Sequence, residues 1–94
     1  MDVRFDWDEA KNQLLIKKRG YSFLEVAQMF SQPYYERVNE GYVPEQFKVT
    51  GWVDNKIYTL IYEQIFDGEQ EVYFLRTYWP ASKEEYKGYI RHAR

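Results

Sequence analysis

The spacing of apolar residues changes along the chain, and each change predicts a different element of secondary structure. Residues 2–7 alternate between polar and apolar side chains, the period of two that is typical of a half-buried strand. Residues 9–19 and 23–30 repeat their apolar positions every three or four residues, which is the spacing of an amphipathic helix. The period returns to two from Phe47 onward. We therefore expect a strand, two short helices and then a run of strands.

Both early helices carry residues that favour helix ends. Asp8 is placed to cap the first helix, and Gly20 is placed to stop it. Ser22 and Glu25 have the spacing of a capping box at the start of the second helix, and Pro33 marks its exit. The first helix is expected to bury Ala10, Leu14 and Leu15.

The second half of the chain has the pattern of consecutive hairpins. Asp54 and Asn55 tolerate the backbone of a tight two-residue turn, and Asp67 with Gly68 begins another turn. These turns separate three segments of alternating polarity, which are residues 47–53, 56–66 and 71–79. Three antiparallel strands are therefore expected.

The remaining segments are the C-terminal helix and an ambiguous stretch before the hairpins. Ser82 and Glu85 form a second capping box, which predicts a helix that runs through residues 84–92. Within residues 34–46, the pattern at 35–38 favours a further strand, whereas glycine and proline later in the segment favour a loop. The segment is left open between these two alternatives.

This element order predicts a single α+β domain that spans the whole chain. Two N-terminal helices follow a short strand, an antiparallel meander sheet comes next, and a helix closes the C-terminus. Helices that cover one face of such a sheet leave the other face at least partly exposed. That face is either a ligand surface or else part of a two-sided core or a dimer interface, and packing is the commoner role of aromatic strand residues. In one register it holds Tyr58, Tyr62 and Phe66, which Tyr73 or Tyr78 can join.

Composition supports one folded domain and excludes several kinds of chemistry. The chain has 94 residues, of which 20% are aromatic, enough large rings to fill a core that aliphatic residues alone would not fill. It has no cysteine, so disulfides, thiolate nucleophiles and sulfur-bound metals are excluded. The first residues do not resemble a signal peptide, and no apolar run approaches the roughly 20 residues of a membrane span. We expect a cytoplasmic protein that does not contact membranes.

Charge limits any role in nucleic-acid binding to local clusters. The net charge is −2, whereas dedicated nucleic-acid binders usually have a basic excess. One cluster, residues 17–19, closes the first helix. Residues 83–94 hold four lysines and arginines against two glutamates, with Tyr86 and Tyr89 between them. The side chains of these clusters either contact the phosphate backbone of RNA or interact favourably with the dipoles at the C-terminal ends of two helices.

Most catalytic arrangements lack the residues they need. His92 is the single histidine, so neither a metal site with histidine ligands nor a nucleophile paired with histidine is expected, and no cofactor is predicted. Metal-free RNA cleavage is still allowed by the composition. In that reaction the ribose 2′-hydroxyl attacks the adjacent phosphate, and the protein only stabilises charge and moves protons.

Three parts of the chain resemble the toxins of the BrnT family, and one of them, residues 47–51, resembles the family's strand that ends in glycine. Residues 5–30 resemble the opening of these toxins, with matched spacing from Trp7 through Gly20 to Phe30. Residues 80–89 resemble the closing segment of the family. The resemblance implies a RelE-like fold, a ribonuclease activity that arrests translation, and a cognate antitoxin protein as partner.

The chain departs from the family pattern at the basic positions. The family's Lys-His-Gly step is Lys18-Arg19-Gly20 here, and the arginine expected before the strand glycine falls at Gln46 or Phe47. The family's Ser-Ala-Arg becomes residues 77–79, which end in a tryptophan. An arginine still binds phosphate but is a poor general base, because it stays protonated.

The resulting hypothesis is a metal-independent ribonuclease toxin of a toxin–antitoxin pair, which is either active or, because of the altered basic positions, weakened or inactive. Arg19 and Arg76 are expected to stabilise the phosphate, and Glu63 or Tyr78 to move the proton. The alternative is a non-catalytic protein-binding module on the same fold, with the aromatic sheet face as its interface. The expected RNA contacts are Lys17, Lys18, Lys48, Trp79, Lys83 and Lys87.

Overall fold

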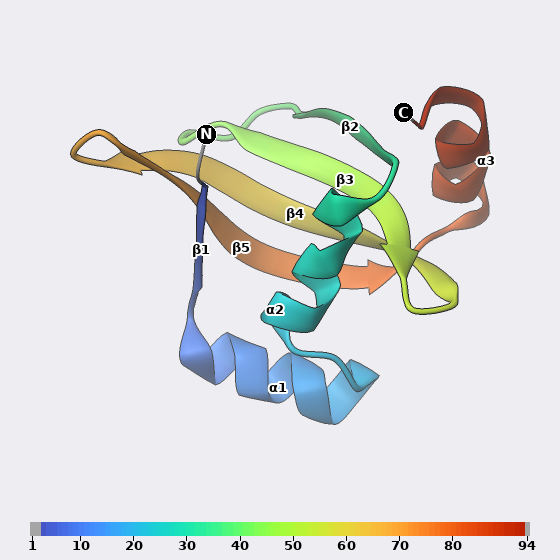
Figure 1. Ribbon diagram of the computed structural model, residues 1–94, viewed down its shortest axis with the longest axis horizontal. Coiled ribbons are helices and arrows are strands. Elements are labelled where there is room, and N and C mark those ends of the chain that lie inside the picture. Colours follow the sequence, from blue (N-terminus) through green and yellow to red (C-terminus); the bar gives the residue numbers. More distant parts are fainter. Residues whose placement is uncertain (1–2, 94) are drawn as a thin grey trace.

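One five-stranded sheet organises residues 3–93, the part of the chain that the computed structural model describes (Figure 1). Asp2 of the predicted first strand and Arg94 of the predicted basic cluster lie outside the described residues. The strands lie side by side in the order β1-β5-β4-β3-β2. Their bounds are β1 Arg4–Trp7, β2 Tyr34–Asn39, β3 Gln46–Val53, β4 Lys56–Asp67 and β5 Gln70–Pro80.

The predicted hairpins are confirmed, and the sheet also contains one parallel pair. Strands β2 to β5 form an antiparallel meander, with Asp54 at a positive φ of 54° in the turn between β3 and β4. Strand β1 instead runs parallel to β5, with Phe5 opposite Tyr73. The expectation of a purely antiparallel sheet is therefore wrong for β1. Alternating polarity identifies a strand but does not specify a partner that lies about 70 residues away in the chain.

The helices begin and end at the predicted caps, but the second one is not a regular helix. The Asp8 side chain accepts a hydrogen bond from the Lys11 amide, and Gly20 closes the first helix with a φ of 91°. The second segment is a single α-turn that continues as a 3-10 helix. Gln32 is already extended because Pro33 follows it, and this shortens the helix. The bounds are α1 Glu9–Arg19, α2 Phe23–Val26, η1 Ala27–Ser31 and α3 Lys83–His92.

Helices α1, α2 and η1 pack on one side of the sheet, which we term the core face. In α1, Leu15 is buried as predicted, but Ala10 and Leu14 are exposed and that prediction is wrong for both. The buried partner of Leu15 is Asn12, whose side-chain oxygen accepts a 2.8 Å hydrogen bond from the Phe23 amide. This polar contact turns α1 away from the face that hydrophobicity alone favours. The buried sheet residues of the core are Val49, Val53, Tyr58, Leu60, Tyr62, Leu75 and Tyr78.

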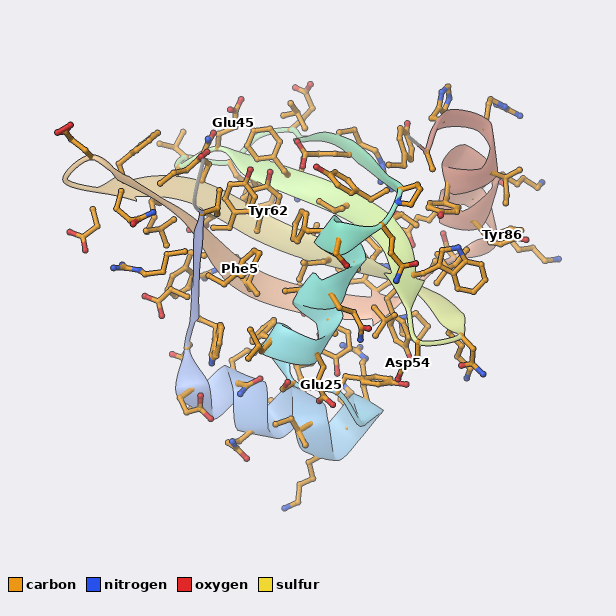
Figure 2. All side chains as sticks on the ribbon, in the orientation of Figure 1. Phe5, Glu25, Glu45, Asp54, Tyr62 and Tyr86 are labelled. Carbon is orange, nitrogen blue, oxygen red and sulfur yellow. The ribbon has the colours of Figure 1, made fainter. Side chains whose placement is uncertain are left out.

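The tyrosine-rich face that was a candidate ligand surface is this core face. Figure 2 shows Tyr62 on the sheet. Tyr58 and Tyr62 are buried, and Tyr73 stacks on Tyr62 with 4.1 Å between ring centroids. The Tyr62 hydroxyl donates a 2.9 Å hydrogen bond to Glu36, so its polar end is satisfied. Phe66, near the end of β4, is exposed. The expectation that these tyrosines lie on the face left open by the helices is therefore wrong, and with it their interpretation as a ligand surface, because they pack in the core beneath the N-terminal helices.

Helix α3 covers one end of the opposite side of the sheet, which we term the outer face. Gly88 allows this close approach, because a Cβ atom there would lie 2.9 Å from the Tyr35 ring. The Tyr89 hydroxyl donates a 3.2 Å hydrogen bond to the Pro33 carbonyl. The helices thus lie on both sides of the sheet, and the outer face stays open beyond α3. No helix within residues 3–93 is long and apolar enough to cross a membrane.

Candidate functional site

A row of polar side chains crosses four strands on the open part of the outer face. Asn39 donates a 3.2 Å hydrogen bond to Gln46, and Gln46 donates a 2.9 Å hydrogen bond to Glu63. Arg76 Nε then lies 3.8 Å from the same Glu63 oxygen. The first three residues are direct cross-strand partners, so their side chains must share a face. This polar row connects β2, β3, β4 and β5.

A β-bulge brings Arg76 into the row. The pairing of β4 with β5 passes from Ile61–Thr77 directly to Tyr62–Leu75 and leaves Arg76 as the extra residue. Such a bulge redirects a side chain without ending the sheet. The Arg76 guanidinium lies 5.4 Å from the Phe74 ring centroid and is half exposed. It is therefore held close to the sheet while remaining accessible.

A hollow with a volume of about 450 Å³ is lined by Asn39, Gln46 and Arg76 of the polar row, and we term it the outer-face pocket. Lys11 from α1, Lys48 from β3 and Arg76 from β5 supply cations to its wall. Thr77 and Trp79 also line it. Cations from elements far apart in the sequence thus converge on one cavity, which suits an anion such as a phosphate.

Glu85 fixes two of the pocket residues from the first turn of α3. It accepts a 3.0 Å hydrogen bond from the Trp79 indole nitrogen, and Lys48 Nζ lies 4.0 Å away. Burial alone would raise the pKa of Glu85. Hydrogen bonds from Ser82, Trp79 and Thr59 and the charge of Lys48 outweigh that effect and hold the pKa below its usual value. The ionised carboxylate therefore orients both the indole and the ammonium group.

Buried polar contacts under α3 support the same region. The Thr50 and Thr59 hydroxyls lie 2.9 Å apart, and both side chains are buried. Arg37 donates a 3.1 Å hydrogen bond to Thr50 Oγ1 and a 3.3 Å bond to the Lys48 carbonyl. Burial lowers the pKa of Arg37. These bonds hold the backbone that carries Lys48.

The structure brings four of the predicted site residues together. Lys48, Arg76 and Trp79 line the outer-face pocket, and Glu63 contacts its edge through Arg76 and Gln46. Lys11, Tyr42 and Thr77 also line the pocket but were not predicted. The positions of Lys11 and Tyr42 depend on how α1 and the β2–β3 loop meet the sheet, which no local pattern reports. Thr77 lies two residues before Trp79 on β5, so strand alternation places both on the same face.

The other two predicted catalytic residues lie elsewhere. Tyr78 belongs to the core face, where its hydroxyl donates a 2.5 Å hydrogen bond to the Tyr21 carbonyl, and burial raises its pKa. Arg19 donates a hydrogen bond to the Tyr78 carbonyl, and its guanidinium lies 5.9 Å from the Tyr78 ring centroid. This pair attaches the end of α1 to β5. Neither side chain lines the outer-face pocket.

The predicted RNA contacts outside the pocket occupy two helices. Lys17 and Lys18 are exposed on the last turn of α1. Lys83 begins α3, and Lys87 lies 3.9 Å from Glu84 on the same helix. His92 stacks on Tyr35 with 5.0 Å between ring centroids. Within the described part of the chain, no three histidine or acidic residues are grouped as metal ligands.

Comparison with known proteins adds no family assignment. No protein-family model matches the chain, and no curated protein matches it at a significant level.

Proposed function

We propose that this protein is a metal-independent ribonuclease with a RelE-like fold, related to the BrnT toxins. The observation that carries the proposal is the convergence of Lys48, Arg76 and Trp79 in one pocket, with Glu63 at its edge. Cations that stabilise a phosphorane, a carboxylate that accepts a proton and an aromatic ring are the groups this reaction needs.

The proposed reaction is an internal transfer on the RNA backbone. The ribose 2′-oxygen attacks the adjacent phosphorus while Glu63 takes the 2′-hydroxyl proton. Arg76 and Lys48 stabilise the negative charge that develops on the phosphoryl oxygens. The bond from phosphorus to the 5′-oxygen then breaks, and Lys11 protonates the leaving oxygen. The products are a 2′,3′-cyclic phosphate and a free 5′-hydroxyl.

Trp79 is assigned to RNA binding and Glu85 to positioning. Because Glu85 fixes the indole N–H, the ring has a defined orientation at the pocket wall and suits stacking on an RNA base. Glu85 accepts hydrogen bonds from the Ser82 amide and the Trp79 indole, whereas Glu63 accepts a hydrogen bond from Gln46 and lies 3.8 Å from Arg76. Glu63 is therefore the better candidate for the proton acceptor.

A protein inhibitor of the antitoxin type is part of the proposal. Its support is the resemblance of residues 5–30 and 80–89 to the BrnT toxins. A ribonuclease that acts on cellular RNA in the cytoplasm must be held inactive during normal growth, and a neutralising partner provides that control.

Cleavage of a labelled single-stranded RNA in the presence of a chelator tests the function. We expect a cyclic-phosphate product, and rates reduced on the order of 100-fold in Glu63→Gln and Arg76→Ala. Arg4→Ala is the matched control, because Arg4 and Arg76 have 50% and 49% exposed side chains and each pairs with one carboxylate. Intact RNA at a large excess of protein, or cleavage that both pocket variants leave unchanged, would refute the proposal.

A further inference from the structure

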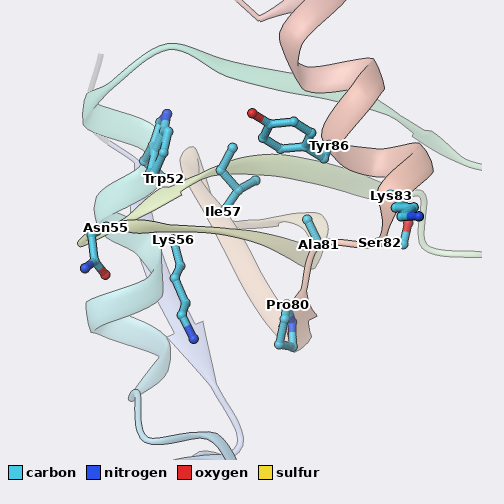
Figure 3. Close-up of a pocket in the computed structure, with 9 residues that line it drawn as sticks. All are labelled: Trp52, Asn55, Lys56, Ile57, Pro80, Ala81, Ser82, Lys83 and Tyr86. Atoms are coloured by element: carbon cyan, nitrogen blue, oxygen red, sulfur yellow. The ribbon is translucent and has the colours of Figure 1, made fainter.

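A second hollow lies at the other end of the outer face, where α3 begins. Its volume is about 460 Å³, and its walls include Trp52, Ile57, Pro80 and Tyr86. Figure 3 shows Trp52 and Tyr86 on either side of Ile57, above the β3–β4 hairpin and beside the first turns of α3. We term this hollow the α3 groove. Its apolar side chains come from four separate elements, β3, β4, β5 and α3.

The apolar surface continues from the α3 groove along the outside of α3. Tyr86 and Ile90 are one helical turn apart, so they lie on the same side of the helix. Their exposed fractions are 48% and 63%. A shallow hollow lined by both Tyr86 and Ile90 connects the α3 groove with the surface around Ile90. Contiguous apolar surface of this kind marks an interaction site more often than scattered exposed residues do.

Basic side chains surround this apolar strip. Lys56 and Lys83 line the α3 groove, and Lys87 and Arg91 line the hollow beside Ile90. Glu84 lies 3.9 Å from Lys87 and neutralises part of this charge. The chain as a whole has a net charge of −2, so the rim is a local reversal of sign. Such a rim attracts an acidic partner and orients it over the apolar strip.

We propose that the α3 groove and the adjoining side of α3 bind an acidic amphipathic helix of a partner protein. A helix with leucines on one side and glutamates on its flanks matches the apolar strip and its basic rim. A helix with leucines contacts the aliphatic side chains of Ile57, Pro80 and Ile90 as well as the rings of Trp52 and Tyr86, whereas a base stacks on the rings alone. A protein therefore uses more of this surface than RNA does, and the test includes RNA. The proposed reaction uses other residues.

The test uses the full chain and a synthetic peptide with leucines at helical spacing and glutamates elsewhere. Calorimetry should detect binding, and Ile90→Ala should weaken it about tenfold. Leu24→Ala is the matched control, because Leu24 is 60% exposed but belongs to α2 on the opposite side of the sheet. Lys83→Glu should weaken binding of the same peptide by a similar factor. A peptide with lysines in place of the glutamates should not bind.

Three results would overturn the proposal. The first is no binding of the acidic peptide, or equal binding of the lysine peptide. The second is a single-stranded RNA oligonucleotide that binds this surface, with affinity lost in Lys83→Glu but kept in Ile90→Ala. The third is self-association of the chain that Ile90→Asp abolishes, because a second copy would then occupy the strip. None of these results depends on RNA cleavage, so the ribonuclease proposal stands or falls separately.

Discussion

Tyr78 and Trp79 are neighbours on β5, but their side chains lie on opposite faces of the sheet. One packs in the core and the other lines the candidate site. Side chains alternate across a strand, so Tyr78 enters the core while Trp79 lines the outer-face pocket. The Tyr78 hydroxyl accepts a 3.2 Å hydrogen bond from the Tyr21 amide and donates to the Tyr21 carbonyl. These bonds hold the turn between α1 and α2. These contacts give the phenol a structural role.

Replacing Tyr78 with phenylalanine should lower stability and leave activity unchanged. The change removes the partner of two backbone groups of Tyr21, so we expect the free energy of unfolding to fall by about 1–3 kcal/mol. Urea denaturation measures this loss. Tyr86→Phe is the control, because the Tyr86 side chain is about half exposed. The free energy of unfolding of this variant should not differ measurably from that of the wild type. A Tyr78→Phe protein with normal stability but slow RNA cleavage would restore the proton-transfer role.

At the scale of elements, the helix ends and turns were predicted from residues close together in the sequence. The position of each helix on the sheet was not predicted, because it depends on contacts between residues far apart in the sequence. Both capping boxes, Ser22 with Glu25 and Ser82 with Glu85, are present because each involves atoms only three residues apart. The position of α3 on the outer face depends on Gly88 meeting Tyr35, which lies more than 50 residues earlier. From the sequence alone, Gly88 is expected only to weaken the C-terminal helix. Its role as a close-packing residue appears once the strand beside it is known.

Acid should weaken the attachment of α3 through Glu85. Its pKa is lowered in the folded state, so its contribution is complete above the ordinary glutamate pKa of about 4.3 and is lost as the pH falls through the lower folded value. The free energy of unfolding should therefore fall more between pH of about 6 and about 3 in the wild type than in Glu85→Gln. Solvent screening limits the difference to less than about 1 kcal/mol. Urea denaturation at both pH values measures it, and equal losses in the two proteins would contradict the assignment.

At the scale of the whole molecule, the candidate site exists only after folding. Lys11, Lys48 and Arg76 come from α1, β3 and β5, and a bulge that no sequence pattern marks redirects Arg76. Sequence reasoning selected Lys48 and Arg76 for their charge but also selected Arg19, which instead attaches α1 to the sheet. The charge of these residues was enough to predict that they suit phosphate binding. Which of them line the same pocket depends on the face of the sheet that each side chain occupies and on the strand register.

The net charge of −2 makes the salt dependence of RNA binding a test of the whole arrangement. In a chain without a general basic excess, phosphate contacts should come from the pocket cations Lys11, Lys48 and Arg76. Three such contacts on single-stranded RNA predict that log affinity falls against log salt concentration with a slope of about −2. Fluorescence anisotropy with a 2′-O-methyl oligonucleotide, which cannot be cleaved by the proposed reaction, measures this slope.

The same titration on two variants locates the phosphate contacts within the molecule. Removing one pocket cation in Lys48→Ala should reduce the slope to about −1.4, because one fewer counterion is released on binding. Lys17→Ala should keep the wild-type slope, since Lys17 is exposed on α1 and does not line the pocket. A flat wild-type titration would mean that RNA binding does not use phosphate contacts. Equal reductions in both variants would mean that the charge acts diffusely, and the outer-face pocket would then lose its claim to bind the RNA backbone.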